Sequence, residues 1–298
     1  QCAKDERLPL EKVFGKRKTR LFEILPFHYN MLVRKYFLDL TASLMASHNA
    51  LPCKVGINPG GIEWTLLANG FRAVSDTGFS ADYSSFDGRA PIFAFQWFCD
   101  LVDDYYGSPP GSPDSNARHV LLMMASCHYT ICENKVFRLV GGLPSGFALT
   151  VIFNSLLNEF YMRYAFISLL RRPLIAAQAI GCKPSDFNKL FVAVYGDDNL
   201  VAVPMELQWY TLPAIAQELE MVNVIIKNGI DKNMDVSSSK MLDLSELTFL
   251  SRGFKRHRLG YVQAPLKWVS IIEPMYWIRP SVGCPDALAM LENIDTGV

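Results

Sequence analysis

The sequence predicts an α+β fold, in which helices and antiparallel strands share a core. Hydrophobic residues make up 50% of the 298 residues, which is ample for a packed interior. Helical and strand patterns are mixed along the chain without the regular strand–helix–strand alternation that builds a parallel sheet. Two short apolar runs, Leu190–Tyr195 and Leu200–Val203, flank Gly196-Asp197-Asp198-Asn199 as in a β-hairpin. The length suits one large domain or two ordinary ones.

The first half of the chain predicts two helices and one strand. Apolar residues at helical spacing predict a helix over Met31–Leu40, and a Gly- and Pro-rich loop follows at Gly56–Gly61. We expect Phe71–Asp82 to be a strand that ends in a polar cluster, and Pro91–Tyr106 to be a helix. Three prolines in Gly107–Asn116 predict a loop at the edge of an insertion.

The second half predicts a long helix, a shorter one and a final hairpin. A Gly-rich turn at Gly141–Gly146 opens a helix over Phe147–Leu170, and a further helix is expected over Leu212–Met221. Leu247–Phe254 and Gly260–Val262 predict the hairpin. Polar residues interrupt the long helix, so we expect it to be buried and not to span a membrane. They are Asn154, Asn158, Glu159 and Arg163.

A formal net charge of zero conceals two basic segments. Lys4–Arg20 holds seven basic and three acidic residues, and Arg252–Arg258 holds four basic residues and no acid. Two cationic patches on an otherwise acidic body suit a partner that carries phosphates. On charge alone, a pair of solvated loops explains them equally well.

The seven cysteines form no CxxC pair. Free thiols in a reducing compartment therefore explain them better than a zinc site does. The chain starts Gln1-Cys2-Ala3, without an initiator Met or a signal peptide, and we expect it to be a piece of a longer protein.

Carboxylates gather at two places that a sheet can bring together. Asp82 ends the expected strand, Asp87 follows five residues later, and Asp197 and Asp198 occupy the expected hairpin tip. Adjacent aspartates repel each other and gain little as turn formers, so a cation should offset their charge. Mg²⁺ takes oxygen ligands, and Asp82 and Asp197 are expected to share two ions about 4 Å apart. Taken alone, either motif is more often ordinary surface.

The Gly-rich turn adds small polar groups beside these acids. Thr150 and Asn154 are four residues apart on one helix face, and Ser145 precedes the helix. Hydroxyl and amide groups there suit a ribose 2′-hydroxyl, which distinguishes RNA from DNA. The alternative is a helix capped near Ser145, with Asn154 satisfied locally.

Taken together, five ordered motifs resemble the RNA-dependent RNA polymerases of positive-strand, picorna-like viruses. The resemblance runs from Lys4 to about Lys267. Its motifs are KDER…GKRKTR, DYSSFD, GGLPSG…T…N, YGDD and TFLSRGF. YGDD alone is a weak signal, whereas the ordered set is a strong one.

The resemblance implies a right-hand polymerase with a palm of antiparallel sheet backed by helices. Family members extend upstream of the basic run and past the last hairpin, so the fingers and thumb are expected to be partial. The implied division is fingers at 1–36, palm at 37–105, a fingers insertion at 106–140, palm at 141–262 and the start of the thumb at 263–298.

The resemblance also implies the role of each site residue. Asp82 and Asp197 would be the chief ligands of Mg²⁺, with Mn²⁺ as a possible substitute, and Asp198 would support them. Lys232 would be the general acid for pyrophosphate departure, with a plain surface lysine as the alternative. Phe249–Phe254 would grip the primer. The ribose would be contacted by Asp87, Ser145 and Asn154, which Thr150 would help to position. The triphosphate would be contacted by Lys4, Lys12, Lys18 and Arg20. The RNA would be contacted by Arg252 and Lys255.

The implied partners are template and primer RNA, ribonucleoside triphosphates and other viral replication proteins. We expect the protein to act in the host cytoplasm, at membrane-associated replication complexes to which partner proteins bring it. Two alternatives stay open. A reverse transcriptase shares the palm aspartates, although Asp87 with Asn154 favours a ribonucleotide polymerase, and a truncated fragment would serve as a non-catalytic RNA-binding scaffold.

Overall fold

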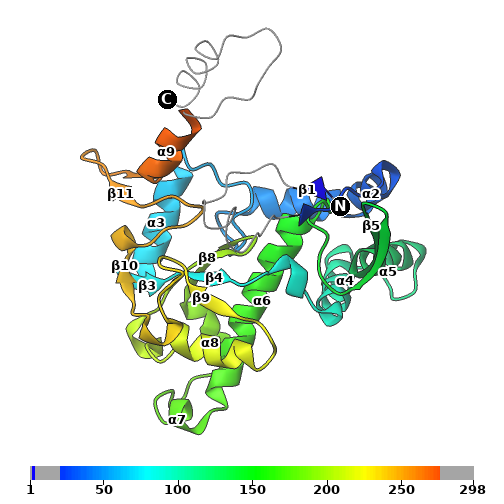
Figure 1. Ribbon diagram of the computed structural model, residues 1–298. Helices are drawn as coiled ribbons and strands as arrows, with labels where there is room; N and C mark the ends of the chain where they lie inside the picture. The colour runs from blue at the N-terminus through cyan, green and yellow to red at the C-terminus, as the bar shows by residue number, and fades with distance from the viewer. Residues whose placement is uncertain (1, 4–20, 276–298) are drawn as a thin grey trace.

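A four-stranded antiparallel sheet forms the centre of the molecule. The computed structural model describes residues 2–3 and 21–275 (Figure 1). The strands run in the order β10-β3-β8-β7. Their bounds are Leu242–Asp243 for β10, Thr77–Phe79 for β3, Asp198–Ala202 for β8 and Phe191–Tyr195 for β7.

Strands β7 and β8 form the hairpin that the sequence predicts. Tyr195 pairs with Asp198, so Gly196 and Asp197 make the turn between them. Gly196 adopts a φ of +59°, a left-handed conformation that glycine tolerates without strain. The apolar runs on either side are buried because this hairpin lies in the middle of the core.

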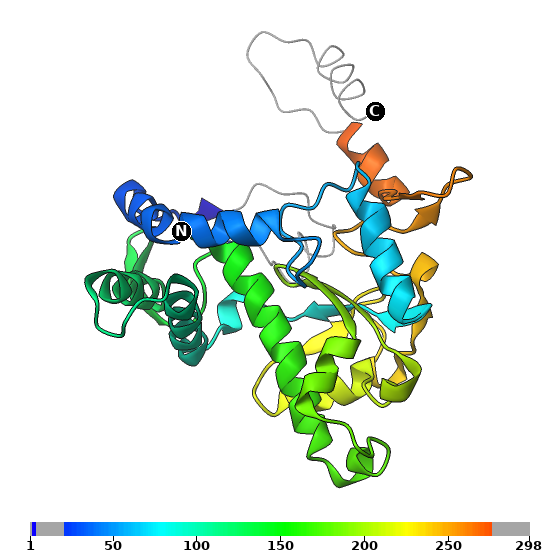
Figure 2. The same cartoon turned by 180° about the vertical axis from the view of Figure 1, so that it is seen from behind.

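The two faces of this hairpin belong to two hydrophobic clusters. Ala193 and Leu200 pack with helix α3 (Glu63–Val74). Val194 and Val201 pack in the cluster that contains helices α6 (Thr150–Leu170) and α8 (Leu212–Glu220). Side chains alternate between the faces of a strand, so consecutive apolar residues show that both faces are covered. Figures 1 and 2 show α3 on one side of the strands and α6 on the other.

The predicted strand Phe71–Asp82 is wrong in its first part. Phe71 is a buried residue of α3, which ends at Val74. Trp64, Leu67 and Phe71 recur at helical spacing and turn one face of α3 toward the sheet. The remainder is two short strands, β3 and β4 (Ala81–Tyr83). Strand β4 pairs antiparallel with β9 (Ile226–Asn228), apart from the four-stranded sheet.

The other predicted helices are confirmed, with shifted ends. The expected segment at Met31–Leu40 lies inside α2, and the long helix begins at Thr150 instead of Phe147. The bounds are Phe27–Ala46 for α2, Ile92–Tyr106 for α4, Thr150–Leu170 for α6 and Leu212–Glu220 for α8. None of the described helices is both long and apolar enough to cross a membrane.

The expected loop Gly107–Asn116 is too long, because helix α5 (Pro113–Ser126) begins inside it. The Ser112 side chain accepts a hydrogen bond from the backbone N–H of Ser115, and proline is well suited to the first helical position. Asp103 of α4 also bonds Arg118, which ties α4 to α5. A β-hairpin that the sequence did not predict follows, β5 (Cys127–Cys132) with β6 (Lys135–Val140).

The final predicted hairpin is displaced. Its strands are β11 (Lys255–Arg256) and β12 (Val262–Gln263), and not Leu247–Phe254. Leu250 and Ser251 have φ of +53° and +60°, so the chain turns sharply there and Phe249 pairs with Arg252. A strand cannot continue through two left-handed residues.

Several short elements complete the described chain. They are β1 (Cys2–Ala3), which pairs with β2 (Leu21–Phe22), η1 (Asp87–Arg89), α7 (Pro173–Ala176), η2 (Pro184–Lys189), η3 (Met205–Leu207), η4 (Val236–Ser238), η5 (Leu244–Glu246) and α9 (Trp268–Met275).

Candidate active site

The predicted carboxylates meet where β4 runs beside β8. Asp82 lies in the middle of β4, Asp197 in the hairpin turn and Asp198 at the start of β8. Buried Asn199 joins the two strands: its Oδ1 accepts the N–H of Ala81 at 2.8 Å, and its Nδ2 donates to the Ala81 carbonyl at 3.2 Å. The structure therefore brings together acids that are more than 110 residues apart.

The acidic site carries a surplus of negative charge. Neighbouring protein atoms partly desolvate the carboxyl group of Asp198, although the residue as a whole is exposed. This desolvation, with the negative charges of Asp197 and Asp82, raises the pKa of Asp198 to about 6. Lys232 acts in the opposite direction on the same pKa. A bound cation would therefore reduce the electrostatic repulsion among these carboxylates.

Lys232 lies where the sequence predicts a basic group. Its Nζ donates to Oδ1 of Asp82 at 2.7 Å, and its side chain is 63% exposed. Asn228 shapes the loop before it, because its Oδ1 accepts the N–H groups of Ile230 and Asp231. The lysine thus reaches the acidic site from a defined turn after β9.

The donor set fits a hard divalent cation. Mg²⁺ prefers carboxylate oxygens and commonly keeps water and substrate phosphates as its other ligands. In the described part of the chain, no three His, Cys, Asp or Glu side chains are grouped as a ready-made metal cage. Lys232 instead neutralises Asp82 directly. That Asp82 and Asp197 share metal ions therefore stays a prediction.

The predicted sugar-reading residues lie at the start of α6. Asn154 is buried, and its Nδ2 donates to Oδ1 of Asp87 at 2.5 Å. The Thr150 hydroxyl donates to the backbone oxygens of Phe147 and Pro144, so it anchors the loop. Ser145 is exposed in that loop. The pairing of Asp87 with Asn154 thus occurs as expected, while Thr150 supports the backbone.

The Gly-rich turn is fixed against two other segments. The N–H of Leu143 donates to the carbonyl of Asp87, and a Cβ at Gly146 would clash with the backbone oxygen of Glu23. Glycine is required at position 146 because two backbones approach closely there. Glu23 follows β2, so the turn is held between the Asp87 segment and the start of the described N-terminal region.

The two predicted RNA contacts, Lys255 and Arg252, differ in how far their side chains are available to bind RNA. Lys255 is exposed in β11, whereas Arg252 is half-buried and donates to the carbonyl of Ala264 at 3.0 Å. Arg252 is thus partly engaged in holding the chain. The predicted triphosphate contacts Lys4, Lys12, Lys18 and Arg20 lie outside the described residues.

Sequence reasoning missed several buried polar residues around the acids. Ser155 and Asn158 of α6 are fully buried, and both hydrogen-bond the Gly196–Asp198 turn. Asn199 and Tyr83 flank the same site. Ser155 and Asn158 are polar side chains within an apolar helix, and Asn158 was noted solely as an interruption of it. Tyr83 and Asn199 stand inside the quoted motifs, where no role was given to them.

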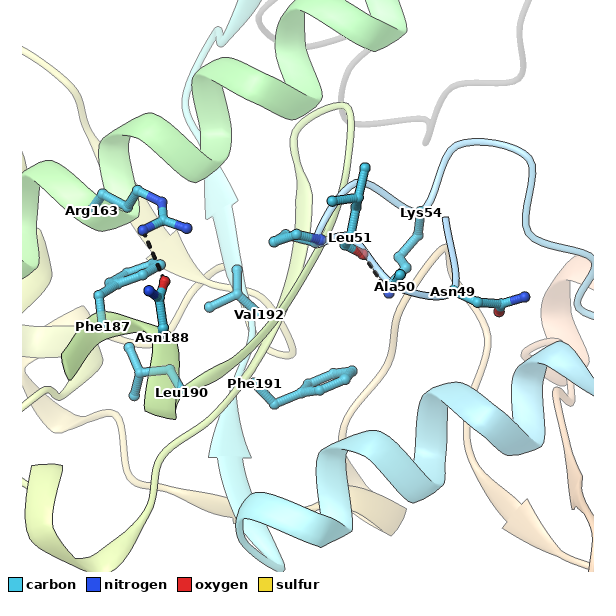
Figure 3. Close-up of a pocket in the computed structure, with 11 residues that line it drawn as sticks. Asn49, Ala50, Leu51, Lys54, Arg163, Phe187, Asn188, Leu190, Phe191 and Val192 are labelled. Carbon is cyan, nitrogen blue, oxygen red and sulfur yellow. Dashed lines mark hydrogen bonds between the residues drawn. The ribbon is translucent and has the colours of Figure 1, made fainter. Parts of the chain in front are cut away.

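A separate cavity of about 340 Å³ is lined by none of the predicted site residues. Figure 3 shows it between the 49–54 loop, the start of β7 and α6. Its cations are already engaged: Lys54 donates to backbone carbonyls of its own loop, and Arg163 contacts Glu159 and Asn188.

Comparisons with known proteins point to one family. The family model "Viral RNA-dependent RNA polymerase" matches residues 1–294. The chain is 98% identical, over its whole length, to part of the RNA1 polyprotein of Tomato torrado virus. It is 39% identical over 97% of its length to that of Cherry rasp leaf virus, and 35% over 99% to that of Cowpea mosaic virus. The chain spans 14%, 13% and 15% of these polyproteins.

The fold also matches a solved structure. Sicinivirus 3Dpol RNA dependent RNA polymerase superposes with a TM-score of 0.73 at 21% identity, over 99% of this chain and 61% of that one. This match confirms the predicted right-hand polymerase fold of the α+β class. With a family model over nearly the whole chain, the chain belongs to the viral RNA-dependent RNA polymerase family.

Proposed function

We propose that this chain carries the catalytic centre for RNA-directed RNA synthesis in a viral polyprotein. The observation that supports this most is the convergence of Asp82, Asp197, Asp198 and Lys232 at one site. A second support is the Asp87–Asn154 pair, whose α6 also hydrogen-bonds the turn that holds Asp197. The proposed reaction is transfer of a ribonucleotide onto an RNA 3′-hydroxyl.

Asp82 and Asp197 would hold Mg²⁺, with Asp198 in support and Mn²⁺ as an alternative ion. When bound, Mg²⁺ would neutralise phosphate charge and favour ionisation of the primer hydroxyl. Lys232 would release Asp82 and give its proton to the departing pyrophosphate. Lys4, Lys12, Lys18 and Arg20 would bind the triphosphate.

The ribose would be recognised by Asp87, Ser145 and Asn154. The Asn154 amide donates to the Asp87 carboxylate, and the buried Oδ1 of Asn154 has no hydrogen-bond partner among the described residues, so it could accept a 2′-hydroxyl. A site built around a hydroxyl discriminates against the deoxy sugar, because the polar groups are then left without their partner. This feature favours RNA synthesis over reverse transcription.

The proposed subdomains follow the right-hand plan. Fingers segments comprise 1–36 and 106–140, the palm comprises 37–105 and 141–262, and the thumb begins within 263–298. Template and primer RNA would bind through phosphates, with Lys255 as an exposed contact. Other viral replication proteins would bring the polymerase to membrane-associated complexes in the host cytoplasm.

A primer-extension assay tests the proposal. It compares ribonucleotides with deoxyribonucleotides, each on an RNA primer–template, in the chain extended at both ends as in its polyprotein relatives. The proposal expects template-dependent extension with ribonucleotides alone. Extension with deoxyribonucleotides alone would favour the reverse transcriptase, and RNA binding without extension by folded protein would favour the scaffold.

A further inference from the structure

Half-buried Asp82 and exposed Asp197 are each held in place through their chain neighbours. Asp82 lies between Ala81, which Asn199 binds through both backbone atoms, and Tyr83. Asp197 lies between Gly196 and Asp198, whose backbones are bonded by α6. The backbone on both sides of each aspartate is thus fixed, while the Asp82 carboxylate also accepts the hydrogen bond from Lys232.

Asn158 connects these two arrangements. Its Nδ2 donates to the carbonyl of Gly196 at 3.1 Å and to that of Asp198 at 3.2 Å, and its Oδ1 accepts the Tyr83 hydroxyl at 3.0 Å. Asn158 is 0% exposed and Tyr83 is 6% exposed. Water does not compete at such a site, and every hydrogen-bonding atom of the Asn158 amide group has a partner.

Ser155 adds a third bond to the turn. Its Oγ accepts the N–H of Gly196 at 2.8 Å and donates to the carbonyl of Val151 at 2.6 Å. Ser155 is 0% exposed, and its hydroxyl both accepts and donates a hydrogen bond. Ser155 directly follows Asn154, which binds Asp87. One turn of α6 therefore carries the proposed sugar contact and the support of the acidic turn.

We propose that Ser155, Asn158 and Tyr83 form a buried positioning clamp that sets Asp197 against Asp82 for nucleotidyl transfer. None of the three touches the reacting groups. They act through the backbone on either side of the carboxylates, and a shift of about 1 Å at a reacting centre costs up to about 100-fold in rate. This inference rests on the proposed polymerase function.

Tyr83→Phe and Ser155→Ala test the clamp with little change of shape. Tyr210→Phe is the matched control: it also removes a buried hydroxyl bonded to α6, at the carbonyl of Met162, without reaching the turn. Loss of one buried hydrogen bond of the clamp should lower kcat about three- to tenfold, with KM for the nucleotide nearly unchanged. The control should keep its kcat.

Mg²⁺ dependence provides a second readout. The clamp predicts that Tyr83→Phe and Ser155→Ala need more Mg²⁺ for half-maximal rate, whereas Tyr210→Phe does not. Equal kcat and equal Mg²⁺ dependence in all three variants and the wild type would overturn the clamp, even if Asp197→Ala abolishes synthesis. That combination would leave the polymerase function intact.

Amide hydrogen exchange tests the clamp without any activity. The Gly196 N–H should exchange slowly in the wild type and faster in Ser155→Ala, while Val194, bonded to Pro52, stays protected in both. Rapid exchange at Gly196 in the wild type would overturn the proposal. An inactive wild type with slow Gly196 exchange would instead overturn only the proposed function.

Discussion

The Nζ of Lys232 donates a hydrogen bond to Oδ1 of Asp82 at 2.7 Å, across 150 residues of sequence. A lysine predicted to protonate the leaving group thus pairs with a carboxylate predicted to bind the metal. The lysine is 63% exposed and Asp82 is 27% exposed, so solvent screens the pair and its contribution to stability is small. The pairing holds Lys232 at the site, where the proposed function requires its proton.

Lys232→Arg separates the charge from the proton. The guanidinium keeps a cation beside Asp82 but does not release a proton near neutral pH. Single-turnover incorporation should therefore slow by about 100-fold, within the usual range for a lost general acid. The unfolding temperature should stay close to that of the wild type. Incorporation at nearly the wild-type rate would return Lys232 to the status of a surface lysine.

The pH dependence of stability reports on Asp198. Its pKa is raised to about 6 in the folded chain, so between about pH 4 and 6 the folded state binds more protons than the unfolded state. Without divalent cations, the free energy of unfolding should therefore fall as pH rises through this window. Asp198 reaches the surface, so the change should be modest.

Asp198→Asn should flatten this dependence, because the amide does not titrate. Denaturant unfolding in a chelator, from pH 4 to 8, measures both proteins. Added Mg²⁺ should stabilise the wild type more than the variant at pH 7, since the ion relieves repulsion that the variant lacks. Identical pH profiles for the two proteins would exclude Asp198 as the source of the pH dependence of stability.

Asn154→Ala tests sugar recognition. Removing the amide breaks its bond to Asp87 and leaves a 2′-hydroxyl with fewer partners. The preference for ribonucleotides over deoxyribonucleotides should fall by about tenfold or more. The ratio of kcat/KM values for the two sugars measures it. Unchanged preference would show that Asn154 serves only to hold Asp87.

Lys255→Gln tests the exposed basic segment. If Lys255 contacts one phosphate, its removal should weaken RNA binding and reduce the salt slope of log Kd by about 0.7 to 0.9. Lys240→Gln, an exposed lysine outside this segment, is the matched control and should leave the slope unchanged. Equal slopes in the Lys255 variant and the wild type would place the RNA elsewhere.

The elements predicted well from sequence are those with a strong local signal. The β7–β8 hairpin followed from two apolar runs around Gly196, and α2 from the apolar residues at helical spacing in Met31–Leu40. Helix α3 was missed because Phe71, which faces the sheet, was grouped with the strand that follows. The β5–β6 hairpin was missed because its exposed strands lack a buried face to mark them.

The residues of the candidate site also divide into those with a clear sequence signal and those without one. The acids and Lys232 followed from ordered motifs, and the structure brings them together. Arg252 was expected to bind RNA, but only the structure shows that it also holds Ala264. Asn158 and Ser155 left no usable signal, because contacts with a turn about 40 residues later depend on tertiary packing. Local patterns do not encode such pairs.

The most direct test of the central claim is single-nucleotide extension of an RNA primer–template by wild type and Asp197→Ala. Both are assayed in the extended chain with Mg²⁺, beside thermal unfolding and RNA binding. The account predicts that the variant loses extension while its unfolding temperature and RNA affinity match those of the wild type. Extension by Asp197→Ala at a rate close to that of the wild type would contradict it.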